Sequence, residues 1–598
     1  MVPSSYNIFG FESVFNFSED EMMILRQEYP RPHFARTTWQ SLNGPWYFDF
    51  DDDDEGLSHD FHLETHHFSR TIIVPFAPQS VTGGINDENL HDVMWYQKKV
   101  TLNGNFENGR ILLCFNAIDS EATIWVNGKF AAFHRNGYSS FESDISDYVN
   151  NGENTITIRV KDGYDTTQPR GKQFWKVKPE ECWYTATSGI WQSVWLEKVG
   201  IDYLVGLRMT PDIDTNFVLF ELETLGKAEE AEITVSFAGR PVKKITFTLD
   251  GKYTKQVINL KEENSVYEVH LWSPEHPNLY QVRICLKSAK NDLDVVNTYF
   301  GMRKISLDEN QRICLNNIPL YQRLILDQGY FKDGDLTATS IDQFEKDIGL
   351  AKKMGFNGAR KHQKIEDPYF YHYANKMGFL VWGEMPSTYE FNHNSVKNNF
   401  SQFIDLINQL YNHPSIICWV PVNESWGARK ALVDKAQQSM IKSLYHLCKT
   451  LDQTRIVSAN DGWENINETD FISIHDYAFS ADGFEEKYKP ENIQKLYPMS
   501  RKLMANGEIY RGQSMILTEF GGFAIKETMT KGLYSYGGVA KTDFVKHLED
   551  FLNTIRRASF SGFVYTQLTD TKQEANGLLD AEHQPKIDIS LLNEVFGK

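Results

Sequence analysis

Short runs that alternate between apolar and polar residues fill most of the first 300 positions of the chain. Clear examples cover 109–115, 122–126 and 154–160, and the second is followed by Asn127-Gly128, a pair that favours a tight hairpin turn. No convincing helical periodicity occurs between about 70 and 300. The pattern predicts β-sandwiches in this part of the chain.

The alternating region divides near position 200. One group of strand-like runs closes at 191–197, and a new group opens at Tyr203 and continues to about 303, which is the length of an immunoglobulin-like domain. We therefore expect a first β-sandwich over 1–200 and an immunoglobulin-like β-sandwich over 201–304.

Beyond about 305, strand-like runs alternate with helical ones. Helical patterns cover 341–354, 368–377, 400–411 and 428–451, and eight runs are typical of strands: 319–326, 356–361, 378–384, 415–422, 455–460, 471–475, 514–519 and 562–567. Eight strands with intervening helices are the elements of a (β/α)8 TIM barrel, which we expect over 305–598. The long connection 478–513 is expected to be a loop with a short helix.

The charge of the chain narrows the class of partner. The 598 residues carry a formal net charge of −19, with 61 Lys and Arg against 80 Asp and Glu. Nucleic acids and anionic membranes attract basic surfaces, so we expect neither as a partner. A carbohydrate fits this charge, and a local basic pocket could still accept an anionic substrate.

The cysteines and the N-terminal residues bear on the compartment. The six cysteines form no C-x-x-C pair and no cluster with zinc spacing, so we expect free thiols in a reducing compartment. Residues 1–10 lack the basic and apolar segments of a secretory leader. No run approaches the roughly 18 apolar residues that span a membrane. These features predict a cytoplasmic protein.

Two acidic strings carry the candidate chemistry. Glu424 follows Trp-Val-Pro-Val-Asn at 419–423, and Glu519 follows Ile-Leu-Thr at 516–518, so each carboxylate ends an apolar strand-like run. The C-terminal ends of barrel strands converge on one pit. Paired carboxylates cleave glycosidic bonds when one protonates the leaving oxygen and the other attacks the anomeric carbon. The apolar neighbours of Glu424 predict a raised pKa, as an acid requires.

Each string also has a structural interpretation. Asn423 could donate its amide to a sugar hydroxyl, or it could cap a helix with Glu424 in the first turn. Glu519 precedes Gly521-Gly522 and could be a surface acid before a turn. The pairing of the two acids in the barrel register favours the catalytic interpretation.

Further polar residues end neighbouring strands. Tyr477 could hydrogen-bond the carboxylate of Glu519, and Arg360 could hold the same carboxylate ionised. Sugar hydroxyls could be bound by Asp327, His362, Glu384 and Asp570. For each of these residues an ordinary ion pair or a solvated loop position remains an alternative. A metal site at His362, Glu384 and His475 has no supporting spacing, so we expect no metal.

Aromatic residues near strand ends could stack on a pyranose face. The candidates are Trp382, Trp463 and Tyr565, and a place in the core of the barrel rim is the alternative for each.

Motifs in a fixed order carry a resemblance that covers nearly the whole chain. They are Leu-Asn-Gly-Pro-Trp at 42–46, Trp-Tyr at 95–96, Trp-Val-Asn-Gly at 125–128, Gly-Ile-Trp at 189–191, Trp-Ser-Pro at 272–274, Phe-Gly-Met-Arg at 300–303, Asn-Gly-Ala-Arg at 357–360, Asn-Glu at 423–424 and Thr-Glu-Phe-Gly at 518–521. With these motifs the chain resembles glycoside hydrolase family 2, the family of β-galactosidases, β-glucuronidases and β-mannosidases.

The resemblance implies a sugar-binding jelly-roll fold for the first β-sandwich and hydrolysis with retention by double displacement. It implies that Glu424 is the acid/base and Glu519 the nucleophile. It also implies that Asn423 binds the 2-hydroxyl of the sugar and that Tyr477 supports the nucleophile. The carboxyl groups of such a pair lie about 5–5.5 Å apart. No organic cofactor is implied, and no ligand motif indicates a site cation.

Two departures from the family bear on the sugar. Where β-glucuronidases carry an Asn-x-Lys pair for the substrate carboxylate, this chain has Glu574, which would repel a uronate, although nearby Lys572 leaves glucuronides open. The chain also has Tyr565 where large β-galactosidases have a Trp. We expect an exo-acting retaining β-glycosidase most like a β-galactosidase. A β-glucuronidase, an α-L-arabinopyranosidase and a non-catalytic carbohydrate-binding protein are alternatives.

Two expectations concern surfaces. The polar and aromatic segment 167–175 of the first sandwich is expected to reach the barrel mouth. An exposed sandwich edge makes a homo-oligomer plausible.

Overall fold

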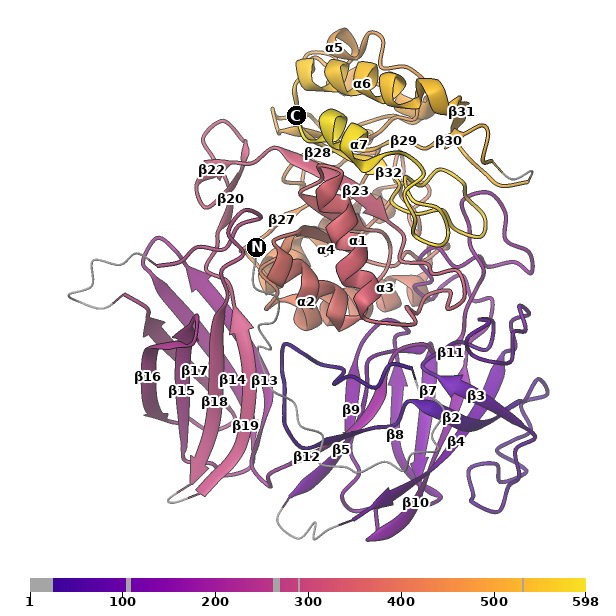
Figure 1. The fold of residues 1–598 in the computed structure, drawn as a ribbon, viewed down its shortest axis with the longest axis vertical. Helices are drawn as coiled ribbons and strands as arrows, with labels where there is room; N and C mark the ends of the chain where they lie inside the picture. Colours follow the sequence, from indigo (N-terminus) through magenta and orange to yellow (C-terminus); the bar gives the residue numbers. More distant parts are fainter. Residues whose placement is uncertain (1–24, 104–108, 262–268, 289–290, 530–531) are drawn as a thin grey trace.

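The computed structural model describes residues 25–598 except 104–108, 262–268, 289–290 and 530–531. Residues 1–10, for which we expect no leader, lie outside the described residues. Figure 1 shows a barrel with surrounding helices in the upper half of the view, the immunoglobulin-like sheets at the lower left and the first sandwich at the lower right. The predicted multidomain fold, two β-sandwiches followed by a TIM barrel, is confirmed.

The first sandwich consists of two main antiparallel sheets. One has the order β1-β12-β5-β9 and the other β3-β2-β4-β10-β7-β8, and a small β6-β11 pair accompanies them. The strands are β1 Trp39–Ser41, β2 Gly44–Phe50, β3 Arg70–Val74, β4 Val93–Leu102, β5 Arg110–Phe115, β6 Ile118–Asp119, β7 Glu121–Val126, β8 Lys129–Arg135, β9 Phe141–Asp144, β10 Gly152–Lys161, β11 Gly189–Ile190 and β12 Val194–Val199. The hairpin predicted at Asn127-Gly128 joins β7 to β8, with φ of 51° and 73°.

The immunoglobulin-like domain also has two sheets, in the orders β13-β14-β17 and β16-β15-β18-β19. Its strands are β13 Tyr203–Asp212, β14 Phe217–Leu225, β15 Glu230–Phe237, β16 Arg240–Thr248, β17 Tyr253–Asn259, β18 Tyr280–Ser288 and β19 Asn291–Phe300. Alternate buried residues of β14 and β15 face one apolar core, which explains the alternating sequence pattern.

The barrel sheet has the order β27-β26-β25-β24-β23-β32-β29-β28, and all its ladders are parallel. The strands are β23 Gln322–Asp327, β24 Gly358–Lys361, β25 Leu380–Glu384, β26 Ile416–Val420, β27 Ile456–Val457, β28 Ile472–His475, β29 Met515–Gly521 and β32 Phe560–Thr566. All eight predicted strands are present. Within the described residues, no ladder joins β27 to β28.

The helices are α1 Asp342–Lys353, α2 Pro368–Met377, α3 His393–Leu410, α4 Lys435–Leu451, α5 Phe484–Lys487, α6 Lys541–Arg557 and α7 Ile589–Phe596. Helix α4 begins seven residues later than predicted because Asp434 caps it by accepting from the Ala436 N–H. Helix α3 begins earlier because Asn392 and Ser395 form a capping box. The connection 478–513 contains α5 and two 3-10 turns, η1 Ile493–Lys495 and η2 Pro498–Ser500.

Two small sheets lie outside the barrel sheet among the described residues after 304. They are formed by β20 Ile305–Leu307, β21 Ile313–Leu315 and β22 Ile318–Pro319, and by β30 Phe523–Ile525 with β31 Gly537–Val539. None of the helices in the described part of the chain has the length and apolar character needed to cross a membrane.

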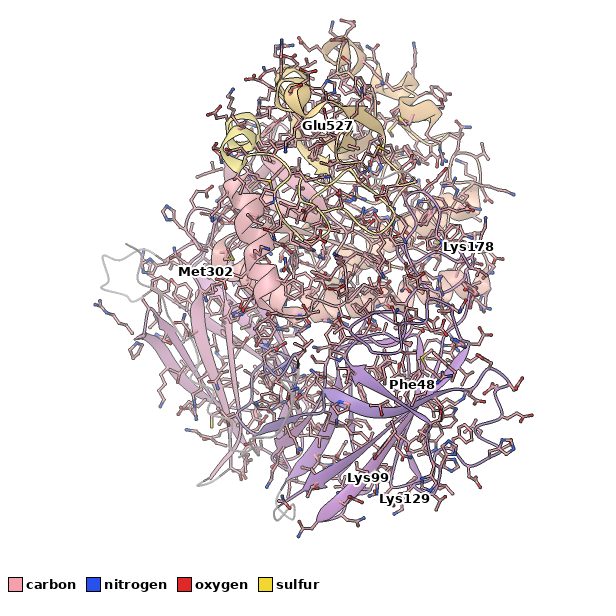
Figure 2. All side chains as sticks on the ribbon, turned by 45° about the vertical axis from the view of Figure 1, so that its right-hand side comes forward. Phe48, Lys99, Lys129, Lys178, Met302 and Glu527 are labelled. Atoms are coloured by element: carbon pink, nitrogen blue, oxygen red, sulfur yellow. The ribbon has the colours of Figure 1, made fainter. Side chains whose placement is uncertain are left out.

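The segment 162–188 of the first sandwich docks on the barrel, as expected for 167–175. The N–H of Arg170 donates to the carbonyl of Ser387 at 2.9 Å, and the N–H of Tyr389 donates to the carbonyl of Thr166 at 2.9 Å. Figure 2 labels Lys178 of this segment at the level of the barrel, whereas Lys99 and Lys129 lie at the opposite end of the sandwich. A loop of the first domain therefore forms part of the barrel surface.

Candidate active site

A pocket opens where the C-terminal ends of the barrel strands meet. Three of its lining residues belong to the docked segment of the first sandwich, and ten belong to the barrel: Lys172, Cys182 and Trp183, and Leu326, Gln328, His362, Glu424, Trp426, Tyr477, Glu519, Tyr536, Thr566 and Glu574. Both glutamates singled out from the sequence line this pocket. One carboxylate oxygen of Glu424 and one of Glu519 lie within 4.8 Å of each other.

Glu424 stands on a strained turn after β26. Its φ is 50° and that of Ser425 is 57°, a left-handed conformation that costs free energy in residues other than glycine. Backbone and side-chain bonds hold the turn: the Glu424 N–H donates to the Asp461 carbonyl at 2.8 Å, and the Ser425 N–H donates to Oδ1 of Asn460 at 2.9 Å. The turn is not the helix start that the alternative interpretation predicted, because α4 begins only at Lys435.

Glu519 lies on β29 and accepts hydrogen bonds from two donors. Arg360 Nη1 donates to Oε1 at 2.9 Å, and the Tyr477 hydroxyl donates to Oε2. The Tyr477 ring stacks on Tyr536 with the centroids 3.6 Å apart. Gly522 allows this stack, since a Cβ there would come within 2.4 Å of Tyr536. Both donors proposed from the sequence therefore reach the carboxylate.

A buried histidine connects the two halves of the site. His475 Nδ1 lies 2.8 Å from Oε1 of Glu424, and its Nε2 lies 2.7 Å from Oδ1 of Asp461 and 3.4 Å from Oε1 of Glu519. The ring is fully buried, and Gly462 leaves room for it, because a Cβ there would meet Nδ1 at 2.7 Å.

The electrostatics of Glu424 are opposite to the expectation from its apolar neighbours. Burial disfavours its ionised form, but the hydrogen bond and the positive charge of His475 outweigh burial and lower the pKa of Glu424 to about 2. Burial likewise opposes the charge of His475, yet Glu519, Asp461 and Glu424 together raise its pKa to about 10. Both shifts favour an ion pair between a Glu424 carboxylate and a protonated His475.

Arg360 lies beneath the pocket and contacts several of the polar residues there. It donates through Nε to Glu384 at 2.5 Å and through Nη2 to Oδ1 of Asn423 at 2.7 Å, and Nη1 lies 3.0 Å from Asp461. Burial raises the pKa of Glu384 to about 7 even though Arg360 opposes the shift. His362 Nδ1 lies 3.0 Å from the other oxygen of Glu384, and burial followed by the charge of Arg360 holds the pKa of His362 well below its usual range.

The first sandwich contributes one wall of the pocket. Lys172 is 8% exposed, and its ammonium lies 4.8 Å from the ring centroid of Trp183. Burial opposes its charge, but Cys182, Glu574 and the two catalytic candidates raise the pKa of Lys172. Glu574 accepts a hydrogen bond from the hydroxyl of Tyr184, which also belongs to the first sandwich. Lys172 and the buried carboxyl group of Glu574 therefore line the same pocket as the catalytic pair.

The structure places two predicted stacking residues away from the pocket. Trp382 is fully buried and donates through Nε1 to Gln322, the first residue of β23, which lies at the opposite end of the barrel. Tyr565 faces outward, with its ring 5.5 Å from Phe520 and 5.3 Å from Phe596. Neither ring is available to a sugar.

Six more candidates lie outside the pocket lining, and three of them, Arg360, Glu384 and Asn423, form the buried network beneath it. The other three are Asp327, Asp570 and Trp463. Asp327 is bound to Lys361 Nζ at 2.9 Å, and Asp570 is bound to Lys586 Nζ at 2.8 Å, so both carboxylates already have a cation. Trp463 lies behind the site, with its ring centroid 5.5 Å from that of His475.

Sequence reasoning did not identify Asp461, Trp183 and Tyr536. Asp461 follows β27, and its position at a strand end was a usable signal. Trp183 lies in a loop far before both catalytic strings, and Tyr536 lies in the connection that follows Glu519; no local pattern marks either residue. For His475 the sequence suggests only the role of a metal ligand.

One group of side chains in the pocket has the spacing of a metal site. Within the described chain, the group whose spacing could hold a metal ion is Glu424, His475 and Glu519. Both nitrogens of His475 already face carboxylate oxygens at hydrogen-bonding distance, so we interpret the group as a hydrogen-bonded network rather than a metal centre.

Comparison with protein families gives one consistent result along the chain. Residues 39–199 match the model described as glycosyl hydrolases family 2, sugar binding domain. Residues 203–303 match glycosyl hydrolases family 2, and residues 331–598 match the family 2 TIM barrel domain.

Individual relatives are distant. A β-galactosidase from Thermoanaerobacter pseudethanolicus is 25% identical over 415 residues, which cover 64% of this chain and 50% of the relative. A β-glucuronidase from Paenibacillus borealis is 24% identical over 612 residues, covering 95% and 98%. The chain spans about half the length of the first curated relatives it matches. The crystal structure of Ruminococcus gnavus β-glucuronidase superposes with a TM-score of 0.75 at 18% identity and covers 96% of this chain and 100% of that one.

Proposed function

The chain belongs to family 2 of the glycosyl hydrolases, and on that premise we propose that it is an exo-acting, retaining β-glycosidase with Glu519 as nucleophile and Glu424 as acid/base. The observation that carries the proposal is the approach of the two carboxylates to within 4.8 Å. Retaining enzymes hold their carboxyl groups about 5–5.5 Å apart, whereas inverting enzymes leave about 6.5–9.5 Å for a water molecule.

The chemistry follows from the contacts of the two acids. Arg360 and Tyr477 donate to Glu519, which stabilises its charge and aims it at the anomeric carbon. In the first step Glu519 forms a bond to that carbon while the leaving oxygen takes a proton from Glu424. In the second step Glu424 accepts a proton from water, and the water oxygen replaces Glu519.

For the sugar, we propose a neutral glycoside, most like a β-galactoside. Glu574 supports this choice, since a buried carboxylate in the pocket lining repels a uronate. Lys572, which could have offset that repulsion, pairs with Asp335 at 2.7 Å and is not among the lining residues.

A β-glucuronidase is the second candidate because of Lys172. Its buried ammonium lines the same pocket, where it could bind a substrate carboxylate. A non-catalytic carbohydrate-binding protein is less consistent with the site, because both carboxylates are present and neither can replace the other. The six free cysteines support a reducing compartment such as the cytoplasm.

The test is a panel of aryl β-D-glycosides (galactoside, glucuronide, glucoside and mannoside) together with the α-L-arabinopyranoside. Wild type is expected to prefer one neutral sugar, and Glu519→Gln should lower its turnover at least about 10⁴-fold. NMR of the first product should show the anomer of the substrate. Turnover that survives Glu519→Gln, or an inverted first product, would contradict the mechanism, and a best rate on the glucuronide would select the second candidate.

A further inference from the structure

The carboxyl group of Glu424 is part of a row of three hydrogen-bonding groups. Its Oε1 lies 2.8 Å from Nδ1 of His475, and Nε2 of the same ring lies 2.7 Å from Oδ1 of Asp461. A ring nitrogen and a carboxylate oxygen attract each other at such distances when a proton lies between them. Both contacts are short enough for a shared proton, and Arg360 Nη1 lies at the longer distance of 3.2 Å from Nε2, so the groups Glu424, His475 and Asp461 can hold two protons, one in each contact.

Charged and titratable groups from five strand ends surround the His475 ring and influence where these protons rest. They are Glu424 after β26, Asp461 after β27, Glu519 on β29, Glu384 on β25 and, as the one cation among these five, Arg360 on β24. Several carboxyl groups around a single guanidinium favour a positive ring. The pKa of His475, raised to about 10, agrees with this arrangement.

We propose that His475 and Glu424 act as one proton-holding unit, in which the proton destined for the leaving group rests on His475 while the site is empty. This proposal rests on the function proposed above, because it concerns how the acid of that reaction is supplied. His475 is a positioning residue in this scheme, since it reaches the substrate only through Glu424.

The proton balance closes over the two steps. In the first step, Nδ1 of His475 gives its proton to Glu424, and Glu424 gives it to the glycosidic oxygen as the C–O bond breaks and the Glu519–carbon bond forms. His475 is then neutral and Glu424 ionised. In the second step, water attacks the anomeric carbon, its proton passes through Glu424 back to His475, and Glu519 leaves as a carboxylate.

The shared proton has a consequence for the pH profile. The unit loses its transferable proton only when the pH approaches the raised pKa of His475, so the basic limb of kcat/KM should lie in the alkaline range. A lone Glu424 would lose its proton at lower pH. The position of this limb reports the role of His475 independently of the absolute rate.

The experiment compares wild type with His475→Asn, which removes the titrating ring. On a glycoside with a poor leaving group, the basic limb of kcat/KM should move to lower pH by more than about one unit. At pH 8, the loss on a 2,4-dinitrophenyl glycoside, whose leaving group needs no proton, should be at least about 10-fold smaller than on the poor leaving group.

Two results would overturn the proposal: a basic limb that stays at the wild-type pH, or equal losses on both leaving groups. If His475→Asn does not fold, Asp461→Asn provides the second variant, because it removes one carboxylate that favours the charged ring. It should shift the limb in the same direction by a smaller amount, and an unmoved limb would count against the unit. Glu519→Gln on the same substrates separates this result from a failure of the proposed function, which would show as surviving turnover.

Discussion

Two buried ion networks in this molecule have similar residues and different surroundings. Where the two sandwiches meet, Glu197 of β12 accepts from Arg31 and Arg36 at 2.9 Å each, and Arg36 also holds Asp294 of β19. The second network is the one beneath the pocket, centred on Arg360.

The difference between them lies in which carboxylates face solvent. The side chain of Glu197 is fully buried, and the hydroxyl of Tyr29 and the indole of Trp195 satisfy its remaining oxygen. In the pocket network, 20% of the Glu424 side chain and 6% of the Glu519 side chain remain exposed. A closed network can only join domains, whereas an open one can exchange protons and bonds with a substrate.

The largest effect is expected on activity, from a substitution in the open network. Glu424→Gln should lower kcat/KM for glycosides with poor leaving groups by about 10²–10⁴-fold, because general acid catalysis is lost. Urea unfolding of this variant should stay close to wild type, since the residue stands on a pocket wall. Equal rates for variant and wild type would remove Glu424 from the acid role.

The second-largest effect is expected in the closed network, where a substitution should lower stability and leave activity unchanged. Glu197→Gln should lower the free energy of unfolding by about 3–5 kcal/mol, because it leaves Arg31 and Arg36 without their shared carboxylate. At temperatures where the variant is folded, its kcat should match wild type. A large loss of kcat in the folded variant would show that the two networks are coupled.

A smaller effect on activity is expected from Lys172, which lines the pocket but does not belong to the open network. Lys172→Met should lower kcat/KM on the preferred sugar by about 10–100-fold, because it removes a charged donor that lines the pocket within reach of a bound sugar. Lys178→Met, at an exposed position of the same segment, is the matched control and should leave the rate unchanged. If both variants behave alike, Lys172 does not contact the sugar.

The smallest effect appears only in acid. Burial disfavours the charge of Glu197, but Arg31 and Arg36 lower its pKa to about 2 from the ordinary 4.5. A depressed pKa stabilises the fold above pH 4.5, and this contribution is lost as the pH falls toward 2. The urea midpoint of wild type should therefore fall through this range more steeply than that of Glu197→Gln, and parallel curves would contradict the assignment.

The sequence predicts the fold well and the site in part, for a reason visible in strand periodicity. Strands repeat every two residues, so Val564 and Thr566 face the barrel interior while Tyr565 between them faces outward. Trp382 shares the inward face with Glu384, but it lies one layer deeper. The strand ends in the sequence therefore indicate both glutamates, but they do not assign a side chain to a layer of the barrel or to its inner or outer face.

The remaining site residues depend on contacts between distant segments. The composition of 167–175 predicts that this segment approaches the barrel, but it does not predict that Lys172 lines the pocket. That position depends on the backbone bond from Arg170 to Ser387, more than 200 positions further along the chain. The charged state of the Glu424 and His475 pair depends on Asp461, which follows a strand of only two residues, Ile456–Val457. Long-range docking and electrostatics therefore need the folded structure.

The shared pocket wall also sets an order of events during protein synthesis. The hydrogen bond from Tyr184 to Glu574 joins residues 390 positions apart. The ribosome synthesises Tyr184 and the rest of the first sandwich early and Glu574 near the end of the chain. Domains generally fold as they emerge from the ribosome. The nascent protein therefore exposes an unfinished pocket through most of its translation, and a product that stops before position 574 would lack the part of the lining that faces Lys172.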